Sequence, residues 1–295
     1  MTRTIQRLFD LTGKTALVTG GSRGLGLQMA HALGEAGAKI MLSSRKASDL
    51  EEAVADLQAA GIDARWIAAD CAVEADIRRL ASETLERMGP VDIVVNNAGA
   101  AWGAPAEDYP VEAWDKVMNL NVRGYFILSQ HIAKHSMIPR QSGRIINIAS
   151  IAGLGGNPPE MQTIAYNTSK GAVINFTRAL AAEWGRYNIT VNAICPGFFP
   201  SKMTAGTLKA LGEGITVPTT FPTTLEKTFK GELTFHGEKK TMEFPVKLVF
   251  ESATRVTATA AFQISLEGFK VERPSLLLVK VDDAAKIEVS LVFKA

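Results

Sequence analysis

Cysteine, net charge and long hydrophobic runs are all scarce in this chain of 295 residues. Its two cysteines, Cys71 and Cys195, do not make a disulfide framework, so we expect a reducing, cytoplasmic setting. The 32 basic and 30 acidic residues leave a formal charge of +2, which disfavours nucleic acid or an anionic membrane as the main partner. No apolar run reaches the roughly 18 residues of a membrane helix, and residues 1–17 lack an apolar signal core.

Three residue types are missing from the end of the chain. After Gly212 there is no Trp, Tyr or Asn, whereas eight of the thirteen Phe lie there. A single average composition therefore describes neither part well. We predict two domains, residues 1–212 and residues 213–295.

The first part alternates short apolar segments with helical periodicity. The predicted strands are 15–19, 39–43, 65–69, 91–95, 143–148 and 190–194, and the predicted helices are 25–36, 49–60, 76–88, 112–134 and 166–187. Strict alternation implies an α/β fold with a Rossmann-like parallel sheet covered by helices on both faces. Ligands of such sheets bind at the carboxyl ends of the strands.

A glycine-rich turn joins the first strand to the first helix. Its spacing, T-G-x-x-x-G-x-G, differs from the common dinucleotide pattern. Glycines let the backbone turn tightly and approach a pyrophosphate at the helix N-terminus. The turn predicts a dinucleotide site made by Gly20, Ser22, Arg23, Gly24, Leu25 and Gly26, although a sharp turn needs glycine even without a ligand.

Charge at the end of the second strand indicates which dinucleotide binds. An acidic residue there would favour the ribose of NAD. The segment instead reads Ser-Ser-Arg-Lys from Ser43 and contains Arg45, and Arg23 lies in the glycine turn. Two cations and no carboxylate favour the 2′-phosphate of NADP; the alternative is that both arginines are solvated surface residues.

Tyr166 and Lys170 are four residues apart and share one face of a predicted helix. A phenol with a pKa near 10 exchanges protons poorly at neutral pH, and a neighbouring ammonium would favour the phenolate. Ser150, which follows the predicted strand 143–148, can hydrogen-bond a carbonyl oxygen. These three residues predict proton transfer coupled to hydride transfer, with no metal ion.

Together these motifs resemble the short-chain dehydrogenase/reductase family over residues 10–212. Further matching words are Asn96-Asn-Ala-Gly99, Asn121 within N-L-N-V-R-G, and Pro196-Gly197. The resemblance implies a catalytic set of Asn121, Ser150, Tyr166 and Lys170, in which Asn121 holds a water that relays protons from Lys170. It also implies cofactor contacts from Asp70, Asn97, Gly99, Lys170, Pro196, Gly197 and Ser201. Sixteen positions separate Ser150 from Tyr166, a few more than is usual in the family, and the extra residues fall in the loop 155–162.

The second part alternates apolar and polar residues with a period of two. One face would carry Met242, Phe244, Val246, Leu248 and Phe250, and other segments follow the same pattern around 229–235, 256–266 and 287–293. This pattern predicts an antiparallel sheet that is wet on one face. The segments 231–237 and 274–282 resemble the C-terminal half of the YceI polyisoprenoid-binding family. This resemblance implies a lipocalin-like half barrel.

The family's last parallel strand, with its Val-Asp-Gly-Gly-like ending, is absent. The edge of the strand 190–194 is therefore expected to lack its usual neighbour, and we expect a strand of the tail to pair with it.

We interpret the chain as an NADP-dependent oxidoreductase that reduces a ketone or aldehyde of the 3-oxoacyl or sugar-acid type, with Tyr166 as general acid. Two alternatives stay open: a lipid- or isoprenoid-binding β module, and a non-catalytic chimeric fusion of two incomplete folds. The family resemblance also implies a homodimer through the helices 112–134 and 166–187.

Overall fold

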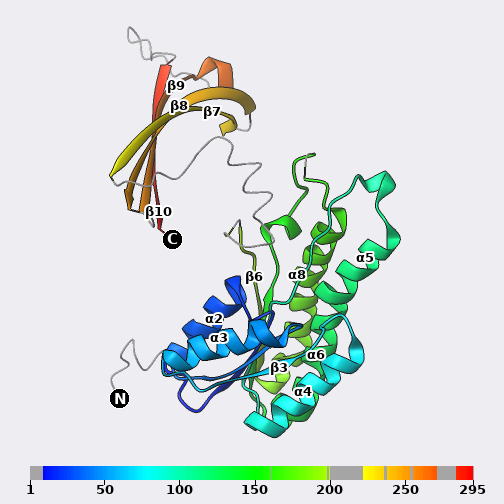
Figure 1. Ribbon diagram of the computed structural model, residues 1–295. Coiled ribbons are helices and arrows are strands. Elements are labelled where there is room, and N and C mark those ends of the chain that lie inside the picture. Colours follow the sequence, from blue (N-terminus) through cyan, green and yellow to red (C-terminus); the bar gives the residue numbers. More distant parts are fainter. Residues whose placement is uncertain are drawn as a thin grey trace. The chain divides into compact units, whose positions relative to one another are not determined.

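The computed structural model describes residues 9–159, 161–197, 199, 222–235, 238–252, 255–270 and 284–294. The chain divides into two compact units, Met1–Ala210 and Leu211–Ala295. Each unit has its own sheet (Figure 1).

The first unit contains a six-stranded parallel sheet with the order β3-β2-β1-β4-β5-β6. The strand order reverses between β1 and β4, and open sheets of this type bind ligands at such a switch point. The predicted Rossmann-like sheet is confirmed. Its strands are β1 (Thr15–Thr19), β2 (Lys39–Ser44), β3 (Ala64–Ala68), β4 (Ile93–Asn96), β5 (Gly143–Ile148) and β6 (Ile189–Ile194).

Helices cover both faces of this sheet. Along β1, Leu17 packs in the cluster that includes α4 (Glu74–Met88), α6 (Gly124–Ile132) and α8 (Ile164–Trp184). Its neighbour Val18 packs in the cluster that includes α2 (Gly24–Glu35) and α3 (Ala47–Ala59). Successive side chains of a strand point to opposite faces, so two hydrophobic cores sandwich the sheet.

The predicted long helix 112–134 is interrupted twice. It consists of α5 (Val111–Met118), the π-helical turn η2 (Asn119–Arg123), α6, the π-helical turn η3 (Ala133–Met137) and α7 (Ile138–Arg140). Three short 3₁₀ helices, η1 (Ala106–Asp108), η4 (Ile151–Gly153) and η5 (Gly185–Tyr187), lie in the connections. The η2 turn carries Asn121, so the first interruption falls at a predicted site residue.

A buried chain of polar side chains links the adjacent strands β4 and β5 to the helices. Asn96 of β4 and Asn147 of β5 are register partners, and the Nδ2 of Asn96 donates to the Oδ1 of Asn147 at 2.8 Å and to the Oγ of Ser129 at 3.0 Å. Asn147 in turn donates to the Oγ1 of Thr177 on α8. All four residues are buried, and these bonds offset much of the cost of removing them from water, although the Oδ1 of Asn96 has no partner among the described residues.

The second unit contains a four-stranded antiparallel sheet with the order β10-β9-β8-β7. The predicted alternation appears along β8, where Leu248 and Phe250 are buried and Lys247 is exposed. The antiparallel β-rich tail is confirmed, while the word at 274–282 lies outside the described residues. The elements are β7 (Thr223–Phe235), β8 (Glu238–Ser252), β9 (Arg255–Ser265), η6 (Glu267–Phe269) and β10 (Ala284–Lys294).

The described strands of each unit pair within that unit. Among the described strands, β7 to β10 pair with one another, and β6 pairs with β5 alone. A pair between a tail strand and β6 is not among the strand pairs of the described residues, and the expected pairing stays a prediction. Within the described ranges, no helix combines the length and the apolar character needed to span a bilayer.

Candidate active site

The glycine turn and the loop after β4 are tied together by hydrogen bonds. The side chain of Asn97 donates to the carbonyl oxygens of Thr19 and Gly20, at 2.9 and 3.1 Å. The hydroxyl of Thr19 donates to the carbonyl of Val95 and accepts from the backbone N–H groups of Asn97 and Ala98. These hydrogen bonds therefore hold the glycine turn and the loop after β4 together at the switch point of the sheet.

Two glycines are required by the geometry of this turn. Gly20 has a φ of 63°, which lies in the left-handed region that favours glycine. At Gly26, a Cβ atom would lie 2.2 Å from the carbonyl oxygen of Gly20. The first turn of α2 can thus approach the strand only without a side chain, which is the role expected of a glycine in a dinucleotide-binding turn.

A cleft of about 530 Å³ lies over the carboxyl ends of the strands in the first unit. It brings together most of the predicted site residues. Asn121 is buried and does not line the cleft, and Ser201 lies outside the described residues. The predicted residues that line it are Gly20, Ser22, Arg23, Gly24, Leu25, Gly26, Arg45, Asp70, Asn97, Gly99, Ser150, Tyr166, Lys170, Pro196 and Gly197.

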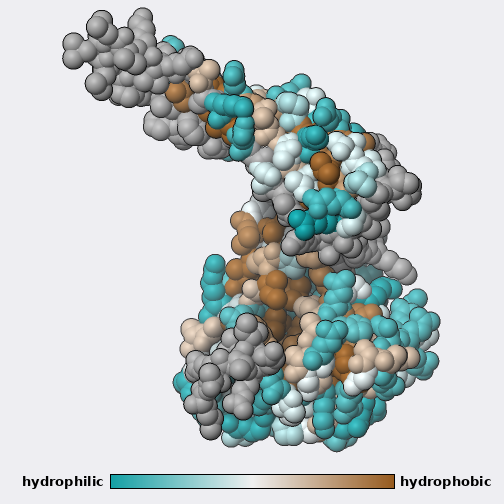
Figure 2. Space-filling model, turned by 90° about the vertical axis from the view of Figure 1, so that its left-hand side faces the viewer, coloured by the Kyte–Doolittle hydropathy of each residue, from teal (hydrophilic) through white to brown (hydrophobic). Residues whose placement is uncertain are grey.

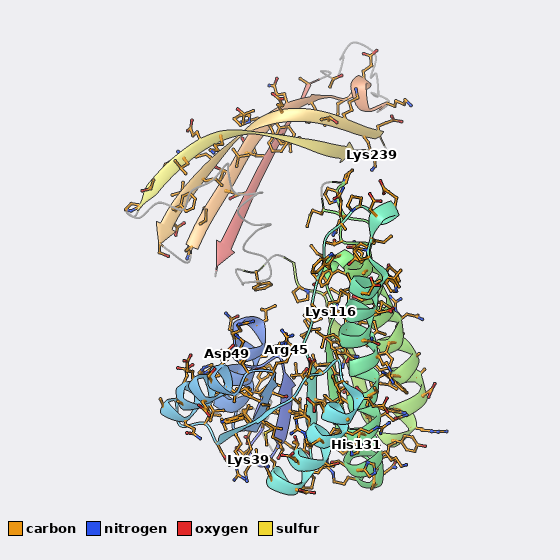
Figure 3. All side chains as sticks on the ribbon, turned by 45° about the vertical axis from the view of Figure 1, so that its right-hand side comes forward. Lys39, Arg45, Asp49, Lys116, His131 and Lys239 are labelled. Carbon is orange, nitrogen blue, oxygen red and sulfur yellow. The ribbon has the colours of Figure 1, made fainter. Side chains whose placement is uncertain are left out.

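The two predicted arginines differ in their surroundings. Arg23 forms an ion pair with Asp49 of α3, with 3.4 Å between Nη1 and Oδ2. Arg45 lines the cleft at the end of β2, and no ion pair with it is found among the described residues (Figure 3). Beside it, the hydroxyl of Ser44 is buried and has no hydrogen-bond partner in the described part of the chain. Arg45 and Ser44 thus leave donors available at this end of the cleft.

Tyr166 and Ser150 meet at the opposite end of the cleft. Ser150 follows β5 and caps η4, where its Oγ accepts from the N–H of Ala152 at 3.1 Å. Burial raises the pKa of Tyr166 above its ordinary value, and a hydrogen bond between its side chain and that of Ser150 acts in the opposite direction. At neutral pH the phenol therefore keeps its proton and can act as a donor.

Lys170 is buried one helical turn after Tyr166. Burial lowers the pKa of its ammonium to about 8, while the thiol of Cys195 acts in the opposite direction. Its Nζ donates to the carbonyl of Ile148 at 2.6 Å and lies 5.6 Å from the ring centroid of Tyr166. The bond to Ile148 fixes the amine beside the phenol at the end of β5.

The side chain of Asn121 is engaged in structural hydrogen bonds. Its amide exchanges two bonds with the backbone of Ala100 and donates to the Oγ of Ser169, all at 2.9 Å. A Cβ placed on Gly99 would lie 3.4 Å from Asn121 and 3.7 Å from Lys170. Asn121 therefore connects the loop after β4 to α8, close to the buried amine, and the predicted water relay stays a prediction.

Several residues of the cleft escaped the sequence interpretation. Besides Ser44, they include Cys71, Leu120 and Phe199. Burial raises the pKa of Cys71 to about 12, with further contributions from Asp70 and Asp76, so its thiol is not activated as a nucleophile. The position of Ser44 directly before Arg45 could have identified it as a residue of the cleft. No sequence pattern distinguishes Leu120 as one. No group of His, Cys, Asp and Glu suited to a metal ion occurs within the described ranges.

Two family models match the chain. Residues 14–211 match the model described as short chain dehydrogenase, and residues 203–293 match the model described as YceI-like domain. Both predicted resemblances are confirmed. The second match shares nine positions with the first, 203–211, and then covers nearly the whole second unit.

Individual relatives match the first unit. The chain is 44% identical over 199 residues to a rhamnolipids biosynthesis 3-oxoacyl-[acyl-carrier-protein] reductase of Pseudomonas aeruginosa, covering 66% of this chain and 77% of the relative. It is 38% identical over 197 residues to a gluconate 5-dehydrogenase of Gluconobacter oxydans, covering 67% and 75%. A gluconate 5-dehydrogenase from Burkholderia cenocepacia, solved in complex with NADP and tartrate, aligns with a TM-score of 0.65 at 34% identity, covering 69% of this chain and 78% of that chain.

Proposed function

The chain belongs to the short-chain dehydrogenase family of oxidoreductases, and on this premise we propose that it reduces a ketone or aldehyde with NADPH. The proposal is carried by one observation. A single cleft contains both the glycine turn and the Ser150–Tyr166–Lys170 group.

The residues at the β2 end of the cleft fit NADP. The glycine turn provides backbone N–H groups at the start of α2, where a pyrophosphate is favoured. Arg45 offers a cation to a 2′-phosphate, and the hydroxyl of Ser44, which has no partner among the described residues, offers a donor. Arg23 is partly neutralised by Asp49, so Arg45 is the stronger candidate. The NADP that is bound to the Burkholderia cenocepacia relative supports this choice.

The protein residues would handle the proton of the reaction. The reduced dinucleotide supplies a hydride for the carbonyl carbon when it is bound. Tyr166 donates its phenolic proton to the carbonyl oxygen, which completes the alcohol, and Ser150 orients that oxygen by a hydrogen bond. The phenolate that remains on Tyr166 is stabilised by the Lys170 ammonium and regains its proton from solvent.

A homodimer through α6 and α8 is part of this proposal. Phe126 of α6 is exposed, and its ring contacts that of Phe176 of α8 in an edge-to-face arrangement. The exposed Phe126 and the half-buried Phe176 beside it offer an apolar surface on α6 and α8 that a second copy could cover.

Tyr166→Phe tests the proposed reaction. Removing the hydroxyl deletes the proton donor without changing the ring, so turnover of a reducible carbonyl should fall by about 10²–10⁴-fold, while NADPH still binds. Turnover is followed by the absorbance of NADPH, and binding by its fluorescence.

Tyr187→Phe is the matched control. Tyr187 lies at the end of η5 and packs against the core of the first unit, outside the cleft. This variant should keep the activity of the parent chain. Full activity of Tyr166→Phe would exclude Tyr166 as general acid, and failure of the parent chain to bind NADPH or NADH would instead favour a non-catalytic fusion.

A further inference from the structure

Large apolar side chains are exposed on the loops that surround the Ser150–Tyr166 pair. Figure 2 shows hydrophobic surface gathered toward the upper end of the first unit. Five such residues, 42–67% exposed, define what we call the apolar rim: Trp102, Ile151, Leu154, Ile164 and Phe199. Exposed apolar side chains that are concentrated in one place often mark a binding site.

The rim is built from three neighbouring loops, the second of which leads into Ile164, the first residue of α8. They follow β4, β5 and β6, which are adjacent strands. The N–H of Ala104 donates to the carbonyl of Gln162 at 2.9 Å, which joins the first loop to the second. The N–H of Ile151 donates to the carbonyl of Pro196 at 3.1 Å, which joins the second to the third. These two hydrogen bonds tie the three loops together, and Phe199 of the rim lines the cleft that holds Ser150 and Tyr166.

Polar side chains of the loop after β5 form hydrogen bonds with one another. The amide of Asn157 donates to the side chains of Thr163 and Asn167, both at 3.0 Å. Asn167 also donates to the carbonyl of Gly155. These three side chains therefore hold the loop in place and have few free groups to offer a substrate.

The described parts of the loops carry no cation. Residues 97–110, 149–159, 161–163, 195–197 and 199 include no Lys, Arg or His, and their charged side chains, Glu107 and Asp108 of η1, are acidic. The ammonium of Lys170, four residues after Tyr166, is buried and donates to the carbonyl of Ile148. A sugar acid carries a carboxylate and many hydroxyls that need charged or polar partners when water is removed. An alkyl chain needs only apolar contact.

We propose that the apolar rim binds the alkyl group of the substrate. The protein would then reduce a 3-oxoacyl compound and not a sugar acid. This inference rests on the proposed reductase function. Tyr166 would protonate the ketone oxygen while the hydrocarbon beyond the ketone lies against residues such as Leu154 and Trp102.

The first test compares substrates of different length. Reduction of 3-oxoacyl thioesters with 4, 8 and 12 carbons, and of 5-keto-D-gluconate, is followed by NADPH absorbance. Burial of each methylene favours binding by about fourfold at most, so kcat/KM should rise at least tenfold from 4 to 8 carbons and should be lowest for the sugar acid. A faster reduction of the sugar acid, or no effect of chain length, would overturn the proposal.

Paired variants locate the effect. Leu154→Arg places a cation in the rim and should reduce the gain in kcat/KM between 4 and 8 carbons at least threefold. Phe9→Arg makes the same type of change at an exposed residue that is not part of the apolar rim, and should leave this gain unchanged. An equal effect of both variants would show that the rim has no part in chain recognition.

A binding measurement separates this inference from the proposed reaction. The saturated octanoyl and butanoyl thioesters cannot be reduced at a 3-oxo group, and their affinities can be measured by calorimetry with NADP present. The octanoyl thioester should bind at least tenfold more tightly, and Leu154→Arg should weaken that preference. If the protein reduces no carbonyl but still prefers the octanoyl thioester, the proposed reductase function is refuted and the inference about the rim is not. Equal affinities would refute the inference.

Discussion

Arg45 is the side chain expected to discriminate between the two dinucleotides. Arg45→Asp replaces a cation with a carboxylate beside the proposed 2′-phosphate. A hydrogen bond to a charged group contributes about 1.5–3 kcal/mol, so the affinity for NADPH should fall about 10- to 100-fold. The affinity for NADH should rise or stay the same, because an acidic residue can bind the ribose hydroxyls.

Fluorescence titration with both dinucleotides measures this change. Lys39→Asp is a control at the other end of β2, where the side chain is exposed and does not line the cleft. It should not alter the preference between the dinucleotides. An unchanged preference for NADPH in Arg45→Asp would rule out Arg45 as its source.

Lys170 is costly to bury as an ammonium. The lowering of its pKa from 10.5 to about 8 corresponds to roughly 3 kcal/mol, offset by about 1 kcal/mol from its hydrogen bond to Ile148. Lys170→Met should therefore raise the free energy of unfolding by about 1–3 kcal/mol at pH 7, while abolishing turnover.

The sign of the pH dependence follows from the direction of the shift. Below about pH 8 the amine is charged in both the folded and the unfolded chain, so the full cost is present. Above pH 10.5 it is neutral in both, and the gain of the variant should disappear. Urea titrations between pH 7 and 10 measure this trend. The exposed Lys116→Met should give no such gain, and a gain that grows with pH would contradict the argument.

The sequence predicted the identity of the site residues better than their electrostatics. The spacing of Tyr166 and Lys170 placed both on one helix face, as found. The sequence pattern indicated Arg23 as a cation available to the 2′-phosphate but did not indicate its ion pair with Asp49. Asp49 is distant in sequence, and only the fold brings the two side chains together. Likewise, the raised pKa of Tyr166 depends on burial by the surrounding loops, which no local motif encodes.

The turn between β1 and α2 is the element most sensitive to a single methyl group. Gly26→Ala would force apart the first turn of α2 and the carbonyl of Gly20. Overpacking of this kind costs about 1–3 kcal/mol, and displacement of the turn should weaken NADPH binding at least tenfold. Fluorescence titration and thermal unfolding measure the two effects.

Gly61→Ala provides the comparison. Gly61 has a φ of 80°, but a Cβ there would meet nothing within 4 Å. The strain should cost about 1 kcal/mol, with no change in NADPH affinity. Equal losses of affinity in both variants would mean that reduced stability, and not the geometry of the turn, weakens binding.

Strand and helix periodicity predicted nearly every described element, but not the breaks within them. The apolar pattern of 112–134 is continuous, and the π-helical turns at η2 and η3 lie inside it. Directly after η2, at the first residue of α6, a Cβ on Gly124 would lie 2.4 Å from the carbonyl of Cys71. Such a close tertiary approach is set by the packing of distant segments, so it leaves no local pattern.

At the scale of the whole chain, two compact units predict two unfolding transitions. NADPH that binds the first unit at 100 times its dissociation constant stabilises it by about 2.7 kcal/mol. For a unit of 210 residues this should raise its Tm by roughly 5–10 °C, while the transition of the second unit stays in place. Calorimetry with and without NADPH measures both.

A single transition that shifts with NADPH would show that the two units unfold together. The domain limits, residues 1–212 and 213–295, remain our proposal until this is measured. Lipid or isoprenoid binding by the second unit also stays a prediction, as does the chimeric origin of the chain.

The asparagine pair of β4 and β5 has a consequence for folding. The other residues of these strands, such as Val94, Val95, Ile145 and Ile146, are alike in shape, so apolar packing alone distinguishes poorly between neighbouring alignments. A slip of one residue would turn Asn96 and Asn147 to opposite faces and leave both amides buried without each other, at about 1–3 kcal/mol for each. The pair therefore favours the native register of β4 and β5 over misaligned registers when the sheet forms.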